Sequence, residues 1–180
     1  MDIGSEYLRD VAERLRTLRQ TAERAVAQVD DEAFFAQPDP ETNSIAINLK
    51  HVGGNLRSRF TDFLTSDGEK PDRDRESEFV IAPNETRAAV EEGWRQGWAL
   101  LEGALASLTP DDVLHTVYIR GEPHTVIGAL NRQVAHIANH VGMIVLLAKH
   151  YAGGAWKTLS IPRGASERFT QEMAEANRRE

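Results

Sequence analysis

The sequence predicts an all-α protein: an antiparallel four-helix bundle with one or two longer crossings and a short extended or loop insertion before the last long helix. Apolar residues recur every three or four positions over four long segments, and segments rich in Pro, Gly and polar residues separate them. The 180 residues contain no repeat, low-complexity tract or linker. We therefore expect a single domain over residues 1–180.

The first helix is expected over residues 6–30, where apolar side chains recur with helical spacing and Ser5 is a candidate N-cap. Residues 34–40 contain two prolines, which interrupt a helix because proline lacks a backbone N–H group. A connector is expected there.

The second helix is expected over residues 44–65, with Asn43 or Ser44 as its N-cap. Gly53 and Gly54 lie near its middle, where each glycine costs about 1 kcal/mol relative to alanine. This cost suggests that another helix approaches closely at this point, or that something bulky, such as a ligand, needs the space.

The polar residues 66–78 predict a turn followed by a loop. A third helix is expected from residue 83 to about residue 108. The motif TPDD at 109–112 predicts a short helical turn, because proline and acidic residues favour the start of a helix. Residues 116–119 are expected to form a short extended piece.

The fourth long helix is expected over residues 126–150, with Thr125 as its N-cap and the glycines at 153–154 as its end. Residues 156–164 contain Trp, Leu and Ile and are too apolar for a solvated tail, so an ordered loop is expected. Residues 165–180 are expected to form a last helix or to fray.

The composition excludes several classes of protein. Cysteine is absent, which excludes disulfides, thiolate metal sites and a cysteine nucleophile. The net charge of −7 disfavours nucleic-acid binding, because the phosphate backbone repels an acidic chain. The first residues lack the pattern of a signal peptide, and the longest apolar stretch, residues 141–148, is too short to span a membrane. We therefore expect a cytoplasmic protein that binds neither nucleic acid nor membranes.

Three histidines form the strongest candidate site. His136 and His140 are four residues apart in the fourth helix, so both imidazoles project from one face. His51 lies in the second helix, in a polar stripe beside its apolar face. Three imidazoles from facing helices suit zinc, nickel or iron and leave one coordination position open, as in catalytic sites. The alternative is that these histidines only decorate a helix surface.

Three further residues are candidates for binding a substrate or orienting the histidine rings. Arg132, one turn before His136, either binds a substrate carboxylate beside the metal or pairs with Asp62 as a structural link. Asn55 and Gln133 are candidates for hydrogen bonds to the rings or to a substrate. The sequence assigns no catalytic residue.

Several segments resemble the DinB-like superfamily of metal-binding four-helix bundles, and within it a branch known only as a domain of unknown function. The resemblance extends from about residue 6 to residue 170, and its most specific parts are SIAINLKH (44–51), RFTDFLT (59–65), DGEKP (67–71), IRGE (119–122), NRQ (131–133), HIANHVG (136–142) and WKTLSIPRG (156–164). Two positions depart from the branch: Met143 stands where glutamine is expected, and Asp72 where an aromatic residue is expected.

The resemblance implies a bundle that holds a divalent metal with one histidine of the second helix and two of the fourth, which match His51, His136 and His140 here. It also implies a homodimer, and a similarity in fold to enzymes that use low-molecular-weight thiols, including S-transferases and an isomerase. We therefore expect zinc or nickel as the metal and a low-molecular-weight thiol as a cosubstrate.

The resulting hypothesis is a metal-dependent enzyme that activates a low-molecular-weight thiol or water in an S-transferase or hydrolase reaction on a small molecule. Two alternatives stay open. One is a non-catalytic metal- or ligand-binding dimer used in stress response or sensing, and the other is a vestigial bundle whose histidines bind nothing. Metal content distinguishes the last alternative, and turnover separates the first two hypotheses.

Overall fold

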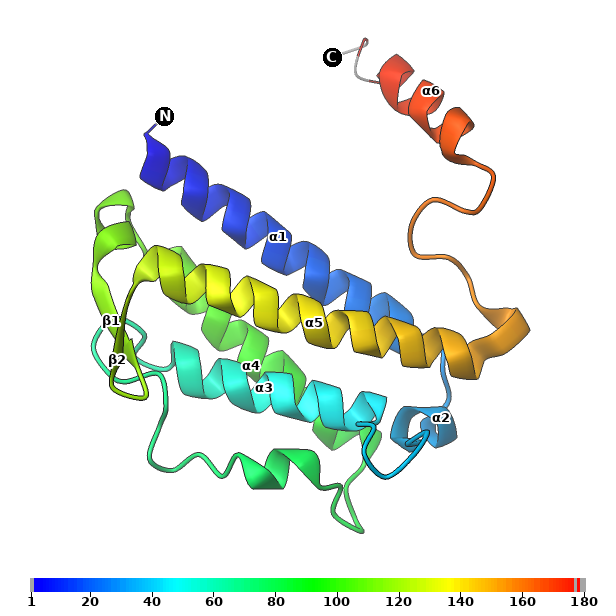
Figure 1. Cartoon of the computed structure of the whole chain (residues 1–180), viewed down its shortest axis with the longest axis horizontal. Coiled ribbons are helices and arrows are strands. Elements are labelled where there is room, and N and C mark those ends of the chain that lie inside the picture. The colour runs from blue at the N-terminus through cyan, green and yellow to red at the C-terminus, as the bar shows by residue number, and fades with distance from the viewer. Residues whose placement is uncertain (1, 177, 179–180) are drawn as a thin grey trace.

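The structure is a computed structural model that describes residues 2–176 and 178 (Figure 1). It is mostly helical, and its long helices are α1 (Ile3–Val26), α3 (Ile45–Phe60), α4 (Arg87–Ser107) and α5 (Val126–Ala152). The one sheet in this part of the chain pairs β1 (Thr116–Ile119) with β2 (Glu122–Thr125). The predicted all-α class is therefore confirmed. No helix among these residues is both long and apolar enough to cross a membrane.

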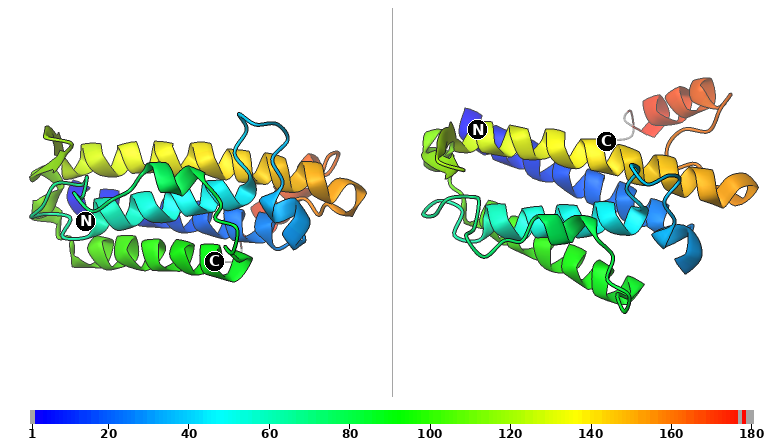
Figure 2. Two further views of the ribbon diagram at one scale, coloured as in Figure 1. Left: turned by 90° about the horizontal axis from the view of Figure 1, so that it is seen from below. Right: turned by 60° about the horizontal axis from the view of Figure 1, so that its bottom comes forward.

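The four long helices lie side by side, and two pairs of neighbouring helices are parallel, which one of the expected longer crossings allows but a simple antiparallel order does not (Figure 1). The Tyr7 hydroxyl, near the start of α1, donates to Asn131 Oδ1 near the start of α5 at 3.0 Å, and these two helices run in the same direction (Figure 1). Helices α3 and α4 also run together, opposite to the first pair (Figure 2). The reason is the long connection at residues 61–86, which carries the chain back along α3 before α4 begins.

Glycines allow α3 and α4 to pack closely. A Cβ atom added to Gly97 would lie 2.6 Å from the carbonyl oxygen of Gly53, and one added to Gly53 would lie 2.9 Å from that of Gly93. Both distances are too short for a real contact, so these positions need glycine. The close helix approach suggested by the mid-helix glycines is therefore present at Gly53.

The starts of α1 and α2 differ from the expected boundaries because aspartates act as N-caps. Asp2, not Ser5, is the N-cap of α1, and its carboxylate accepts a hydrogen bond from the Ser5 N–H group at 2.9 Å. A short helix, α2 (Asp31–Phe35), occupies the start of the expected connector. It begins there because Asp30 accepts from the Ala33 N–H group at 2.9 Å.

Helix α3 begins where expected but ends earlier. Ser44 is its N-cap, and the Ser44 hydroxyl accepts from the Ile47 N–H group at 3.1 Å. The helix ends at Phe60 because Thr61 is extended and Asp62 has a positive φ of 50°.

Helix α4 begins at Arg87, later than expected, with Thr86 as its N-cap. The loop before it contains a 3₁₀ helix, η1 (Glu76–Phe79), and the predicted helical turn after it is a second one, η2 (Pro110–Leu114).

The insertion expected before the last long helix is the β1–β2 hairpin, and Thr125 caps α5 as predicted. Asp67, in the loop after α3, anchors the hairpin turn. Its carboxylate accepts from the N–H groups of Arg120 and Gly121 at 2.8 and 2.7 Å. This anchor places the Arg120 side chain close to the end of α3.

The chain leaves α5 through η3 (Gly153–Ala155), where Gly153 has a positive φ of 52°. The expected last helix is α6 (Ser166–Ala176), which lies apart from the four long helices (Figure 1). Residues 177 and 179–180 of the segment expected to be helical or frayed lie outside the described residues.

Candidate metal centre

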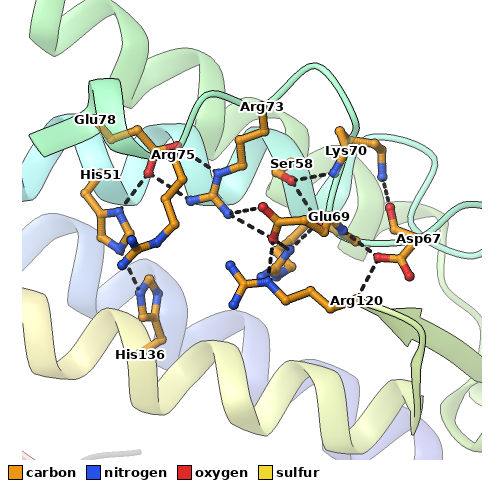
Figure 3. Close-up of polar contacts among 12 residues, drawn as sticks. His51, Ser58, Asp67, Glu69, Lys70, Arg73, Arg75, Glu78, Arg120 and His136 are labelled. Carbon is orange, nitrogen blue, oxygen red and sulfur yellow. Dashed lines mark hydrogen bonds and ion pairs between the residues drawn. The ribbon is translucent and has the colours of Figure 1, made fainter.

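The structure brings His51 of α3 together with His136 and His140 of α5. One ring nitrogen from each histidine lies within 4.8 Å of the other two, and Nε2 of His51 is 3.2 Å from Nε2 of His136 (Figure 3). His51 and His140 are buried, and His136 is partly buried. The three imidazoles therefore form one cluster between facing helices and do not decorate a solvated surface.

Asn48, one turn before His51, sets the orientation of His140. The Asn48 side-chain nitrogen donates to the Ser44 carbonyl oxygen at 2.8 Å, which turns the amide oxygen toward Nδ1 of His140, also at 2.8 Å. Because this oxygen is an acceptor, Nδ1 of His140 carries the proton. The lone pair of His140 is therefore on Nε2, where a metal ion can use it.

Glu78 of η1 does the same for His51. Its Oε2 atom accepts from Nδ1 of His51 at 2.8 Å, and Arg73 donates to both carboxylate oxygens at 2.8 Å (Figure 3). Only 7% of the Glu78 side chain is exposed, so these partners replace water. His51 therefore also carries its proton on Nδ1 and directs the Nε2 lone pair toward His136.

Gly54 provides the space that Glu78 occupies. A Cβ atom at this position would lie 2.7 Å from Cδ of Glu78. The bulky group suggested by the second mid-helix glycine is therefore a carboxylate of the chain itself, and the expectation that this space serves a ligand is wrong for Gly54.

Burial keeps two of the histidines neutral. Burial, together with the nearby His140 and His51, lowers the pKa of His136 from 6.5 to about 3. Burial and then His51 lower the pKa of His140 to about 4. Burial alone would raise the pKa of Glu78, but hydrogen bonds from His51 and Arg73 outweigh it and lower that pKa. At neutral pH His136 and His140 thus offer uncharged nitrogen ligands, and an ionised carboxylate lies behind His51.

The donor set fits a divalent metal ion. Zinc–nitrogen bonds of about 2.0–2.1 Å in a tetrahedral site separate two ligand nitrogens by about 3.3 Å. The Nε2 atoms of His51 and His136 are 3.2 Å apart. Among the described residues, the cluster comprises three histidines and no fourth His, Cys, Asp or Glu, which leaves a coordination position for a non-protein ligand.

A cavity of about 190 Å³ opens beside the cluster, with His51 and His136 in its wall. The three further residues selected from the sequence, Arg132, Asn55 and Gln133, all line this cavity. Asn55 Oδ1 and Gln133 Nε2 are buried there without a hydrogen-bond partner in the described part of the chain. The fold therefore brings all three residues to one cavity beside the histidines.

Asn55 and Gln133 do not orient the rings in this structure. The Nδ1–H groups of His140 and His51 donate to Asn48 and Glu78 instead. For Asn55 and Gln133, contact with a substrate is the role that stays open.

Arg132 does not form the structural link that was one of its two expected roles. Its side chain is exposed, and the ion pairs among residues 2–176 and 178 do not include an Arg132–Asp62 pair. The guanidinium group borders the cavity, which leaves contact with a substrate anion as the other expected role.

Asn48 and Glu78 are partners of the histidines that the sequence did not predict. Asn48 lies in the same polar stripe as His51, three residues before it, and this spacing was a usable signal. Glu78 lies in a loop, where no helical periodicity relates it to His51. The only hint in the sequence was Gly54, which leaves room beside α3.

A comparison with protein-family models places the chain in a known family. The family described as "Protein of unknown function (DUF1572)" matches residues 2–165. The chain belongs to this family. The DUF1572 segment includes the histidine cluster and the whole cavity, and it ends just before α6 begins at Ser166. No curated protein and no solved structure was found to match the chain. The expected domain of unknown function is thus confirmed, whereas membership of the DinB-like superfamily stays a prediction.

Proposed function

We propose that this DUF1572 protein is a metal-dependent enzyme built as a DinB-like four-helix bundle, in which His51, His136 and His140 hold zinc or nickel. The orientation of the imidazoles carries the proposal. Asn48 and Glu78 accept the Nδ1 protons of two rings, so that their Nε2 lone pairs remain available within the cluster. Such a fixed Nδ1–H group, with the lone pair left on Nε2, is the arrangement that metal-binding histidines almost always have.

A divalent ion at this position would lower the pKa of a thiol or water molecule and so make it a better nucleophile. The residues of the chain prepare the site for that chemistry. Glu78, held by Arg73, places negative charge behind His51, as the carboxylate in a carboxylate–histidine–metal arrangement does. Asn55 and Gln133 supply one free acceptor and one free donor to orient a polar substrate in the cavity.

The open coordination position and the cavity favour an S-transferase or hydrolase over a structural metal site. Structural sites are usually closed by a fourth protein ligand. The cavity of about 190 Å³ is smaller than the range of roughly 300–1,000 Å³ typical of drug-sized ligands. These features support a small molecule as substrate, with a low-molecular-weight thiol or water as the nucleophile.

Metal content tests the site. Untagged protein purified without chelator should contain about one equivalent of divalent metal per chain by mass spectrometry, as expected for a single site. His136→Ala should lose the metal, whereas His150→Ala, which changes an exposed histidine near the end of the same helix, should keep it. Full metal occupancy in His136→Ala would refute the site.

Turnover tests the enzyme. The wild-type protein should convert a model electrophile in the presence of a thiol, or hydrolyse an activated ester, and chelation of the metal should abolish the activity. A protein that binds metal but turns over no substrate in either assay would favour the non-catalytic metal-binding alternative.

We further propose that the protein is a cytoplasmic homodimer that binds neither nucleic acid nor membranes, as the DinB-like resemblance and the acidic composition suggest. The molar mass in solution, measured by light scattering, tests the oligomeric state. A monomer at micromolar concentration would remove this part of the proposal without affecting the metal site.

A further inference from the structure

The cavity beside the histidines is strongly basic, although the chain as a whole carries a net charge of −7. Five arginines line it, and no Asp or Glu does so in the part of the chain that the structure describes. They are Arg59, Arg73, Arg75, Arg120 and Arg132. So many guanidinium groups around one small cavity repel one another unless anions offset their charge.

Two carboxylates offset part of this charge from behind the cavity wall. Glu69 pairs with Arg59 at 2.8 Å, with Arg120 at 3.2 Å and with Arg73 at 3.4 Å (Figure 3). Glu78 pairs with Arg73. The side chains of Arg59 and Arg73 are 9% and 6% exposed, so these two arginines are buried, paired parts of the wall.

The other three arginines make few ion pairs with the described carboxylates, so most of their N–H donors are available to a ligand. Arg132 is exposed and has no ion pair with a described residue, and Arg120 is 55% exposed with a single carboxylate contact. Arg75 stacks its guanidinium group 4.7 Å from the ring centre of Phe79, and its one ion pair among the described residues is with the exposed Glu76. These guanidinium groups can engage an anion without leaving a buried partner unpaired.

Two buried amides point independently to a polar ligand. Asn55 and Gln133 are 7% and 5% exposed, and the unpaired Oδ1 and Nε2 atoms lie in the wall of the same cavity. A buried polar atom without a partner is costly, and such atoms are rare in folded proteins. A ligand with donor and acceptor atoms would satisfy both.

We propose that this cavity is an anion-binding subsite, in which Arg75, Arg120 and Arg132 bind an oxyanion of the substrate next to His51 and His136. The inference rests on the proposed function for its role in a reaction, because it names the substrate class: small molecules that carry a carboxylate, a phosphate or a similar oxyanion. Guanidinium groups bind such anions through paired, charge-assisted hydrogen bonds. Anion binding itself does not require turnover.

Isothermal titration calorimetry of the full chain, as purified, tests the subsite with malonate and inorganic phosphate as probes and the uncharged malonamide as a matched analogue. The wild-type protein should bind at least one of the two anions and bind malonamide at least tenfold more weakly, as expected when charge-assisted hydrogen bonds are lost. The anion that binds more tightly distinguishes a carboxylate from a phosphate substrate.

Arg132→Gln and Arg120→Gln should each weaken anion binding by about tenfold, because each removes charge-assisted hydrogen bonds. Arg24→Gln makes the same charge change at an exposed position of α1 and should alter binding by less than about twofold, as expected for a distant, screened charge. Absence of binding by both anions, equal binding of malonamide, or equal weakening by Arg24→Gln would each overturn the proposal.

Metal content, measured on the same preparations, separates this inference from the proposed function. Anion binding that depends on Arg132 in a protein without metal affinity would keep the subsite and refute the metal-dependent enzyme. Metal binding without anion binding would refute the subsite and leave the proposed metal site in place.

Discussion

A single methyl group at Gly54 should weaken metal binding without touching a metal ligand. Gly54 lies on α3, and a Cβ atom there would lie 2.7 Å from Cδ of Glu78. Glu78 cannot simply rotate away, because its carboxylate is fixed by Nδ1 of His51 and by two contacts from Arg73. Gly54→Ala therefore separates Glu78 from His51.

The two effects of this substitution have different magnitudes. Replacing a mid-helix glycine by alanine stabilises the helix by about 1 kcal/mol, which offsets part of the cost of moving Glu78. Loss of the carboxylate behind a metal-binding histidine typically lowers metal affinity by about 10- to 100-fold, or roughly 1.4–2.8 kcal/mol. Metal affinity should thus fall markedly while the fold persists.

Competition between the protein and a chromophoric chelator for zinc measures this effect. Gly142→Ala is the matched control, because Gly142 lies on α5 two residues after His140 and a Cβ atom there would meet nothing within 4 Å. The control should bind zinc as tightly as the wild type. Nitrogen-15 spectra of the imidazoles should show loss of the Nδ1–H form of His51 in Gly54→Ala only. A Gly54→Ala protein with wild-type zinc affinity would refute the role assigned to Glu78.

Three further predictions concern the same helices. Asn48→Ala should lower the free energy of unfolding by about 1–3 kcal/mol in urea titrations, because the buried Nδ1–H group of His140 loses its acceptor; an unchanged midpoint would contradict this hydrogen bond. Gly97→Ala should lower the unfolding free energy by about 1–3 kcal/mol, because its Cβ atom would meet the carbonyl oxygen of Gly53 at 2.6 Å; a rise in melting temperature would show that α3 and α4 can separate without cost. In metal-stripped protein, the unfolding free energy should fall as the pH falls from 6.5 toward about 4, by at most about 1.4 kcal/mol per pH unit for each of His136 and His140. Below pH 6.5 the unfolded chain binds protons on these rings that the folded chain excludes, so a flat profile would indicate that the rings are solvated.

The sequence was sufficient to predict the parts of the structure that follow from helical periodicity. The spacing of His136 and His140 places both rings on one face of α5, and His51 lies opposite them because α3 packs against α5. The caps at Ser44 and Thr125 were also predictable, because each precedes a long amphipathic segment.

Other parts depend on interactions between distant segments. The early end of α3 depends on the left-handed conformation of Asp62, which no local pattern requires. The shared direction of α3 and α4 depends on the path of the loop at residues 61–86. Glu78 belongs to that loop, so its pairing with His51 could not be predicted before the path of the loop was known.

The ion pairs along the cavity wall would link the two proposed functions of the site, metal binding and anion binding. Arg120 contacts Glu69, Glu69 contacts Arg73, and Arg73 holds Glu78 against His51 (Figure 3). An anion that draws Arg120 away from Glu69 changes the charge balance on Arg73, and with it the hold of Glu78 on His51. Any factor by which anion binding alters metal affinity must then equal the factor by which the metal alters anion affinity. The loop at residues 61–86 would thereby couple the two proposed sites, and a titration of either ligand in the presence of the other would measure the coupling free energy.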